Sequence, residues 1–357
     1  MPALLLDKLK CLKNIERMAR RAEQHQLSFR PHCKTHQSAE ISSWFRDFGI
    51  SRITVASFQM AGYFAKAGWD DILIAFPFQP GELEPLQVLS EKCHISILVD
   101  SPAALPFLNH LSNPVGFYID IDTGYGRTGV RTENPELIEQ IIVKAGRKSQ
   151  LHFKGFYCHA GHSYKVLTQE DREAIHQKAR SDLEGLKQQF SEHGPRILYG
   201  DTPNCSTQND FSGIDEITPG NFVFYDLVQH ALGACSLEEI AVAMECPVAG
   251  KYMHNGQILI HGGAVHFSKE SLSIKGKTVY GRLVQHSQDG IFIPEPTAWL
   301  TNVSQEHGVL EASGEVFSQI SIGDTLLFLP VHSCLTANLA NEYRTFDGNR
   351  ISNIHSI

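Results

Sequence analysis

Several features of membrane, secreted and nucleic-acid-binding proteins are missing from this sequence of 357 residues. No apolar run approaches the roughly 18 residues of a membrane-spanning helix, and the first residues lack the charged stretch and apolar core of a secretion signal. The eight cysteines form no Cys-x-x-Cys pair, which favours reduced thiols over a disulfide framework. The formal net charge is −8 at pH 7, and no lysine and arginine stripe suggests a nucleic-acid partner. We therefore expect a cytoplasmic protein that binds neither a membrane nor nucleic acid.

What the sequence does contain is a regular alternation of apolar runs and amphipathic stretches. Hydrophobic residues make up 42% of the chain and charged residues 20%, as in a globular protein with a sizeable core. Eight candidate strands alternating with helices predict a parallel (β/α)8 TIM barrel. An open, doubly wound sheet is the alternative, but the Gly-rich turn that it would need after the first strand is absent. The eight strands are predicted at Leu27–Arg30, Ile53–Ala56, Ile72–Phe76, Ile95–Val99, Gly116–Ile121, His152–Tyr157, Arg196–Tyr199 and Glu216–Thr218.

The pattern changes from about Ala241 onward to short β-rich segments with turn residues between them. We predict a barrel over residues 7–240, followed by an all-β C-terminal domain over residues 241–357 that also takes up residues 1–6. In the second domain, strands are predicted at Gln257–His261, Thr278–Leu283, Ile291–Pro294, Gly308–Glu311 and Thr325–Leu329.

One lysine, Lys34, stands among unusual neighbours just after the first predicted strand. Nearby cationic side chains, Arg30, His32 and His36, and partial burial both disfavour the charged amine and lower its pKa. A neutral amine is what an imine-forming lysine needs. Two other interpretations stay open on these residues alone: metal binding by the two histidines and the cysteine between them, or an ordinary solvated lysine.

Polar motifs also follow the later strands, where barrel enzymes place their chemistry. The loops after the seventh and eighth strands carry Thr202, Gly220 and Asn221. Together they suggest a phosphate cradle of one hydroxyl and two amides, although each Pro-containing loop alone reads as a turn.

An imine-forming lysine, a phosphate cradle, Arg127 after the fifth strand and His159 after the sixth suggest pyridoxal 5′-phosphate (PLP). Arg127 is the candidate partner of the pyridine nitrogen, and an arginine there would leave that nitrogen largely unprotonated. The competing interpretation of Arg127 is a salt bridge with Asp120 or Asp122.

A further motif lies in the predicted β domain, at His332-Ser333-Cys334. On a strand or extended loop, His332 and Cys334 point to the same side and can bind one metal ion. Imidazole with thiolate selects Zn²⁺ over Mg²⁺. A pair of core residues is the competing interpretation.

These motifs occur in one order along the chain: the lysine motif, Asp122–Val130, His159–Tyr164, Pro219-Gly220-Asn221 with Tyr225-Asp226, and His332-x-Cys334. The sequence resembles the fold-type III PLP enzymes, which are alanine-racemase-like barrels. It is most similar to their branch of D-serine dehydratases, D-threo-3-hydroxyaspartate dehydratases and D-threonine aldolases. The resemblance covers nearly the whole chain.

The resemblance implies a role for each candidate residue. Lys34 would hold PLP as an imine and remove the α-proton of the substrate, and Arg127 would contact the pyridine nitrogen. His159 and Tyr164 would flank the ring and its phenolic oxygen. Thr202, Gly220 and Asn221 would hold the phosphate, and His332 and Cys334 would bind Zn²⁺ against the β-hydroxyl of the substrate.

The function implied is dehydration and deamination of a small D-3-hydroxy amino acid to a 2-oxo acid and ammonia, by a homodimer. The cysteine of the metal pair favours a dehydratase over an aldolase, whose pair would be His-x-Asp. An aldolase, a racemase, a non-catalytic PLP carrier and a plain zinc hydrolase remain alternatives. Two places depart from the family pattern: Asp201 beside the predicted phosphate site, and the stretch His261–His266.

Overall fold

The computed structural model describes residues 1–287, 290–292, 297–312 and 314–356. The chain forms two compact units, which we call the barrel unit and the β unit. The barrel unit comprises Glu16–Lys34 and Ser42–Gly220, and the β unit comprises Met1–Ile15, Thr35–Ile41 and Asn221–Ile357. Helix α1 (Lys8–Gln24) begins in the β unit and ends in the barrel unit. The Asp7 side chain caps this helix by accepting a hydrogen bond from the Lys10 N–H.

The barrel unit contains all eight predicted strands, in parallel pairing. The strand order is β2-β10-β9-β8-β6-β5-β4-β3. A parallel bridge between His32 and Thr54 joins the two ends of this order, so the ring closes and the predicted (β/α)8 barrel is confirmed. The strands are β2 (Ser28–Phe29), β3 (Ile53–Val55), β4 (Asp71–Pro77), β5 (His94–Val99), β6 (Val115–Asp122), β8 (Leu151–His159), β9 (Arg196–Gly200) and β10 (Glu216–Ile217), with β7 (Val130–Arg131) paired to β6.

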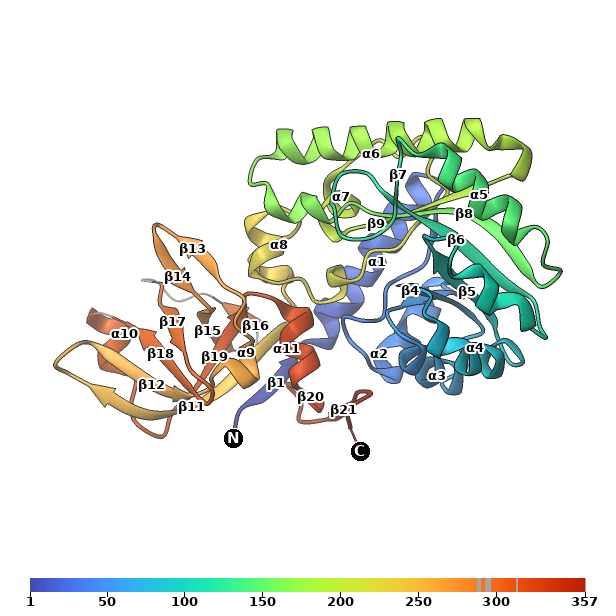
Figure 1. Cartoon of the computed structure of the whole chain (residues 1–357). Coiled ribbons are helices and arrows are strands. Elements are labelled where there is room, and N and C mark those ends of the chain that lie inside the picture. Colours follow the sequence, from blue (N-terminus) through green and yellow to red (C-terminus); the bar gives the residue numbers. More distant parts are fainter. Residues whose placement is uncertain (288–289, 293–296, 313, 357) are drawn as a thin grey trace. The chain divides into compact units, whose positions relative to one another are not determined.

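The strands are nearly continuous apolar runs because barrel strands are buried on both faces. Side chains from five neighbouring strands fill part of the interior as one cluster, which contains Leu73, Leu98, Tyr118, Tyr157 and Leu198. Helices surround these strands on the outside (Figure 1). They are α2 (Ala39–Trp44), α3 (Phe58–Lys66), α4 (Leu83–Ser90), α5 (Pro135–Ala145), α6 (Gln169–Gln189) and α7 (Thr202–Thr207).

Helix α5 illustrates why the outer helices form where they do. Asn134 caps it by accepting a hydrogen bond from the Leu137 N–H, and Pro135 occupies the first turn, where its missing N–H costs nothing. Ile138, Ile141 and Ile142 recur at helical spacing and are buried, so one face of the helix packs on the strands.

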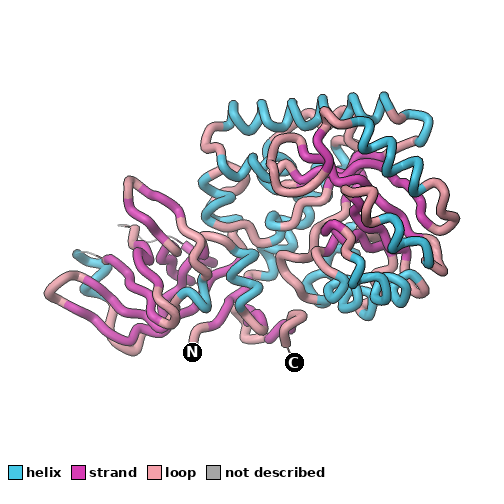
Figure 2. The backbone as a smooth tube through the Cα atoms, viewed as in Figure 1, coloured by secondary structure: helices cyan, strands magenta, loops and turns pink. Residues whose placement is uncertain are grey.

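The β unit is built on an antiparallel ring of strands, in the order β12-β18-β17-β15-β19-β11, which the pairing of β11 with β12 closes. Strands predominate over helices in this unit (Figure 2). Strand β1 (Ala3–Leu6) pairs with β11 and with β20, so the first residues join this unit. The strands are β11 (Val242–Tyr252), β12 (Gln257–His261), β15 (Gly281–Ser287), β17 (Trp299–Val303), β18 (His307–Glu311), β19 (Thr325–Pro330), β20 (Glu342–Thr345) and β21 (Arg350–Ser352), with β13 (Leu272–Ile274), β14 (Lys277–Val279) and β16 (Gly290–Phe292) outside that path.

Short helices connect these strands. They are α8 (Leu227–Ala231), α9 (Ala264–Phe267), α10 (Gly314–Gln319) and α11 (Ser333–Leu339). The strand predicted at Thr278–Leu283 is divided into β14 and β15 at Tyr280, and part of the one predicted at Ile291–Pro294 lies outside the described residues. The predicted boundary after residue 240 remains a proposal. No helix among the described residues is long and apolar enough to cross a membrane.

Candidate active site

Lys34 lies in a turn just beyond the carboxyl end of β2, in the barrel unit. The backbone before it is held firmly: the Cys33 N–H donates to the Thr54 carbonyl at 2.8 Å, and the His32 N–H donates to the Pro219 carbonyl at 2.9 Å. The Lys34 N–H itself donates to His32 Nδ1 at 3.4 Å. Lys34 is half-buried, so the structure presents a lysine on a fixed backbone at the end of the barrel where such enzymes place their chemistry.

Arg30 does not supply the cationic neighbour that the sequence predicted for Lys34. Its Nη1 lies 2.8 Å from Asp71 Oδ1, and its Nε lies 3.2 Å from Glu216 Oε1. These two acids are the first residues of β4 and β10, at the amino ends of the strands. The prediction was wrong because a side chain alternates inward and outward along a strand, and that of Arg30 turns back into the barrel toward the acids.

His159 ends β8 and is held as a neutral ring. Its Nδ1 donates to the Gly200 carbonyl at 2.7 Å, which fixes the proton on Nδ1 and leaves Nε2 as the acceptor. Burial, followed by the positive charges of Lys34 and Arg127, lowers the pKa of His159 to about 3. An uncharged imidazole near the lysine suits the flank of an aromatic cofactor, because it adds no further positive charge to the site.

Arg127 lies in a loop that folds back on the end of β6. The Asp122 carboxylate accepts hydrogen bonds from the Gly124 and Gly126 N–H groups, both at 3.0 Å. A Cβ at Gly129 would come within 2.9 Å of the Asp120 carbonyl oxygen, so the close return of the loop requires glycine. The Arg127 guanidinium is exposed and lies 5.1 Å from the centre of the Tyr125 ring.

The competing interpretation of Arg127 as a salt-bridge partner finds no support. Among the ion pairs of the described residues, none joins Arg127 to Asp120 or Asp122. The guanidinium is therefore available to a ligand at the mouth of the barrel.

The loop after β9 brings Tyr164 and Thr202 together. The Thr202 N–H donates to the Tyr164 hydroxyl at 3.2 Å. Thr202 is 1% exposed, and its Oγ1 is buried without a hydrogen-bond partner among the described residues. A buried hydroxyl left unpaired costs roughly 1–3 kcal/mol, so this atom is the kind of group that a bound phosphate would satisfy.

Asp201 does not oppose a phosphate at this loop, because its carboxylate turns away and caps helix α7. It accepts from the Asn204 N–H at 2.8 Å and from the Ser163 hydroxyl at 3.0 Å. The Asn204 amide donates to the other carboxylate oxygen at 3.1 Å and to the Tyr199 hydroxyl at 2.9 Å. Burial raises the pKa of Asp201 to about 6, although these hydrogen bonds act in the opposite direction.

The two predicted phosphate ligands in the last loop of the barrel belong to different units. Gly220 ends the barrel unit and Asn221 begins the β unit. The Asn221 side-chain Nδ2 donates to Asp226 Oδ2 at 2.6 Å and also approaches Cys334 Sγ at 3.4 Å. Only the backbone amide of Asn221 is therefore left for the predicted role.

The metal pair lies in the β unit, and its local structure differs from the prediction. His332 is extended but immediately precedes helix α11, and Cys334 lies in the first turn of that helix rather than on a strand or loop. The two side chains still face each other, because the helix begins between the two residues. Burial opposes charge at His332, but its hydrogen bond with Cys334 and the charge of the thiolate raise the pKa of His332 to about 9.

Cys334 has the surroundings of a metal-binding thiolate. Burial alone would raise its pKa, but the hydrogen bond and charge of His332 lower the pKa below its ordinary value. Thr35 Oγ1 lies 3.2 Å from the sulfur. Thiolate and imidazole on one short segment fit Zn²⁺, and binding of the ion would displace the proton that His332 carries against Cys334.

Asp226 supports this pair and received no role from the sequence. Its carboxylate accepts from the Ser333 N–H at 2.9 Å and from the Gln229 N–H at 2.9 Å. It is 1% exposed and holds the backbone between the two metal-pair residues. The Tyr225-Asp226 dipeptide in the family motif was a signal for it, but nothing in the sequence shows which backbone amide such an acid binds.

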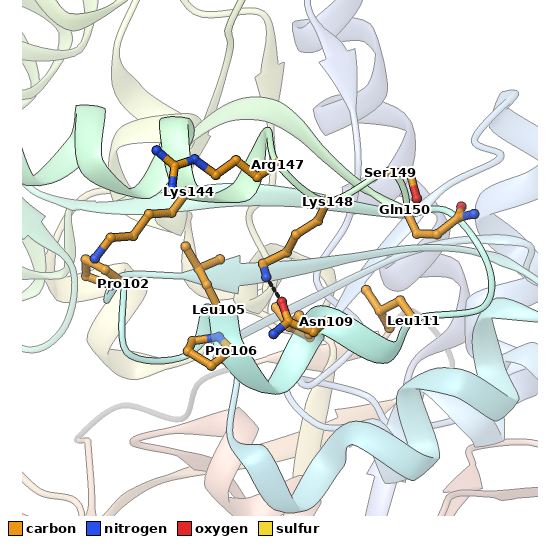
Figure 3. A pocket seen from close by; sticks show the side chains of 11 residues that line it. Pro102, Leu105, Pro106, Asn109, Leu111, Lys144, Arg147, Lys148, Ser149 and Gln150 are labelled. Carbon is orange, nitrogen blue, oxygen red and sulfur yellow. Dashed lines mark hydrogen bonds between the residues drawn. The ribbon is translucent and has the colours of Figure 1, made fainter.

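Two cavities in the barrel unit are not lined by any of the predicted site residues. One, of about 620 Å³, lies between the 3-10 segment Leu105–His110 and the turn before β8, and Lys148 reaches across it to Asn109 (Figure 3). The other, of about 360 Å³, is lined by Arg30 and its neighbours. This second cavity lies at the amino ends of the strands, where polar residues in barrels serve stability rather than catalysis.

Comparison with known proteins agrees with this geometry. The family described as alanine racemase, N-terminal domain, matches residues 6–226, and the chain belongs to this family. Residues 241–346 match the domain described as putative serine dehydratase domain.

Individual relatives match over almost the full length. The chain is 28% identical to D-threo-3-hydroxyaspartate dehydratase of Delftia sp. strain HT23, covering 94% of this chain and 91% of that one. It is also 28% identical to D-serine dehydratase of Dictyostelium discoideum, covering 98% and 94%. A solved structure of a D-threo-3-hydroxyaspartate dehydratase, a cysteine-to-alanine variant in the metal-free form, superimposes with a TM-score of 0.91 at 27% identity, covering 100% of this chain and 98% of that one.

Proposed function

We propose that this protein is a PLP- and zinc-dependent lyase that converts a small D-3-hydroxy amino acid, of the D-serine or D-threo-3-hydroxyaspartate type, to a 2-oxo acid and ammonia. The observation that carries the proposal is the hydrogen-bonded His332–Cys334 pair, with a thiol pKa below its ordinary value, in a chain whose barrel presents Lys34 at its mouth. The relatives reported above are dehydratases, and the metal-free cysteine variant among the solved structures supports a cysteine as metal ligand.

The residues of the barrel unit fit PLP. Lys34 would hold the cofactor through its amine and, when that amine is free, would accept the α-proton of the substrate on Nζ. Thr202 Oγ1 would donate to the phosphate, which would satisfy its unpaired hydroxyl. Arg127 would contact the pyridine nitrogen, and neutral His159 and Tyr164 would flank the ring. When bound, PLP spreads the electron pair left on the α-carbon over its ring.

The residues of the β unit fit Zn²⁺. His332 and Cys334 would hold the ion. Thr35 and Asn221 contact the sulfur at 3.2 and 3.4 Å, and Asp226 fixes the backbone between the two residues. A zinc ion is a Lewis acid that makes the β-hydroxyl a better leaving group. The hydrogen bonds around Cys334 orient its sulfur, and those from His332 and Thr35 favour the thiolate form.

The test is a product assay with purified protein, PLP and Zn²⁺. D-serine, D-threonine and D-3-hydroxyaspartate are each compared with the L-form, and 2-oxo acid, ammonia and aldehyde are measured separately. We expect equal amounts of 2-oxo acid and ammonia from a D-isomer. Removal of a general base typically costs about 10²–10⁴-fold in rate, and Lys34→Ala also removes the covalent anchor, so its activity should fall at least that far.

Matched variants make the assay specific. Lys154→Ala changes an exposed lysine on β8, and Cys93→Ala changes a cysteine of the barrel unit; both should retain activity, while Lys34→Ala and Cys334→Ala lose it. Aldehyde with glycine would instead show an aldolase. Interconversion of D- and L-forms would show a racemase, and retention of PLP without any product would favour the carrier.

The homodimer and the cytoplasmic location belong to the same proposal. The family resemblance supports a dimer, and the eight free cysteines suit a reducing compartment. Light scattering during size-exclusion chromatography measures the dimer directly, and a monomeric mass at assay concentration would contradict it.

A further inference from the structure

Three side chains with metal-binding atoms meet at one place in the β unit, apart from the His332–Cys334 pair. His261 ends β12, His266 lies on α9, and Glu306 lies in the turn between β17 and β18. Their ligand atoms all lie within 4.8 Å of one another. Among the described residues, no other group of three or more His, Cys, Asp or Glu side chains meets this criterion. Strands β12, β17 and β18 lie side by side (Figure 1).

The backbone under these side chains is fixed by hydrogen bonds between the two segments. The Gly262 N–H donates to the Glu306 carbonyl at 2.9 Å, and the Ala264 N–H donates to the Ser304 carbonyl at 2.7 Å. A Cβ at Gly263 would come within 2.4 Å of the carbonyl oxygens of Ser304 and Gln305, so the close contact of the segments requires glycine. The stretch His261–His266 thus carries both histidines against the turn that holds Glu306.

The distances suit a small divalent ion. His261 Nε2 lies 3.4 Å from Glu306 Oε2. Two ligands bound tetrahedrally to Zn²⁺ at its usual bond lengths are about 3.3–3.6 Å apart, so this pair already has the separation of two zinc ligands. The His261 and His266 rings meet edge to face with centres 5.6 Å apart, which lets the nitrogens of both point to a common position.

The protonation state also suits a metal. Burial lowers the pKa of His266, the charge of Glu306 acts in the opposite direction, and the nearby His261 lowers it further; the net lowering favours the neutral ring that a metal binds. Its Nδ1 accepts a long hydrogen bond of 3.3 Å from the Gly263 N–H. Binding through Nε2 would move the ring proton to Nδ1 and lose that weak bond, which is a modest cost.

We propose that His261, His266 and Glu306 form a second zinc site, in which two imidazoles and one carboxylate bind the ion and water completes the coordination. Two neutral nitrogens with one carboxylate are a donor set that Zn²⁺ takes with an open fourth position. The side chains of His261 and Glu306 are 44% and 48% exposed, so the ion exchanges with solvent and binds less tightly than in a closed site of four ligands.

This site is independent of the proposed lyase reaction, because it shares no ligand with His332 and Cys334. Bound zinc would link α9 and the end of β12 to the β17–β18 turn. We therefore expect it to stabilise this corner of the β unit, and to add a second zinc equivalent to the protein.

The test counts zinc ions in protein first stripped of metal. We expect two equivalents in the unchanged chain, one in Cys334→Ala, one in His261→Ala or Glu306→Gln, and none in Cys334→Ala combined with His261→Ala. His254→Ala changes another exposed histidine of the same unit and should keep both equivalents. One equivalent in the unchanged chain, unaffected by His261→Ala and Glu306→Gln, would overturn the proposal.

Cobalt substitution distinguishes the two sites without relying on activity. Co²⁺ bound by Cys334 gives a thiolate charge-transfer band in the near ultraviolet, whereas a site of imidazoles and carboxylate gives only visible d–d absorption. His261→Ala should lose part of the visible absorption and keep the thiolate band, so this variant answers the question even if Cys334→Ala does not fold. A spectrum unchanged by His261→Ala would refute the second site, whatever substrate the protein turns over.

Discussion

The two ends of the barrel are both polar, but they use their polar groups differently. At the amino ends of the strands, Arg30 is 4% exposed and is paired with Asp71 and with Glu216, which is 0% exposed. At the mouth, the buried Thr202 hydroxyl has no partner among the described residues, and Arg127 has no ion pair with its neighbouring acids. Charges that are paired inside the fold stabilise it, whereas polar groups without a protein partner are available to bind a ligand.

This comparison separates two kinds of buried polarity that look alike in a sequence. Arg30 and Lys34 are four positions apart in one polar segment that also contains Pro31 and His32. The structure sends Arg30 into an ion-pair network and leaves Lys34 at the open end. Substitutions at the amino end should therefore change stability, and substitutions at the mouth should change ligand affinity.

The largest effect is expected from Arg30→Met. Removing one member of a buried ion pair leaves an uncompensated charge and costs roughly 3–5 kcal/mol. Glu216 would keep Arg52 at 3.6 Å and Arg196 at 3.9 Å, so we expect the lower end of that range. Urea denaturation without PLP measures the change in the free energy of unfolding.

A double variant sharpens this prediction. Arg30→Met combined with Glu216→Gln removes both charges, and it should recover part of the lost stability. PLP affinity of the folded protein should stay unchanged in both variants. If Arg30→Met weakened PLP binding without destabilising the fold, the distinction between the two ends of the barrel would be lost.

An intermediate effect is expected from Thr202→Val at the mouth. A hydrogen bond to a charged group contributes roughly 1.5–3 kcal/mol, so loss of the hydroxyl should weaken PLP binding about 10- to 150-fold. The stability of the PLP-free protein should stay level or rise, because the hydroxyl removed is buried and unpaired. A spectroscopic PLP titration and a urea titration measure the two quantities.

Thr207→Val is the matched control on the same helix. The Thr207 hydroxyl donates to the Pro203 carbonyl at 2.8 Å, so its loss should lower stability and leave PLP affinity intact. Opposite behaviour of the two threonines would confirm that the unpaired hydroxyl faces the ligand. Equal PLP affinity of Thr202→Val and the unchanged chain would contradict the phosphate assignment.

The barrel could be predicted from the sequence because most of its strands are local apolar runs bounded by turns. Strand β11 was not predicted. It contains Glu245, Pro247 and Lys251, and it forms because β1, β12 and β19 pair with it. Such long-range pairing overrides local preference. The β unit was therefore predicted in outline, with some of its strands missing.

The candidate site was predictable where a motif follows a strand directly, as with Lys34 and His159. The direction of a side chain was not, and so Arg30 was placed with the wrong partners. Glu306 joins His261 and His266 across a turn some forty residues away in sequence, and no local pattern indicates which acid a distant histidine will meet. The helix at Cys334 was not predicted because its N-cap residue is His332, which is not one of the residue types that usually mark the start of a helix.

The smallest effect is a change in pH dependence at Asp201. The pKa of this group is raised from about 3.9 in the unfolded chain to about 6 in the fold, so the native state binds the proton more tightly. Its contribution to stability is complete below about pH 4 and is lost as the pH rises through 6. The resulting slope is at most about 1.4 kcal/mol per pH unit. Asp201→Asn keeps a capping oxygen and should make the slope shallower.

Urea midpoints measured across this pH window test the prediction. Part of the slope should remain, because burial also raises the pKa of Asp120 to about 6. Asp210→Asn is the control: Asp210 is exposed and its pKa is lowered by hydrogen bonds from Ser212, so this change should leave the slope between pH 4 and 6 as it is. If Asp201→Asn also left that slope unchanged, the carboxylate would titrate as a solvated group, and the buried cap that turns it away from the phosphate loop would not exist in solution.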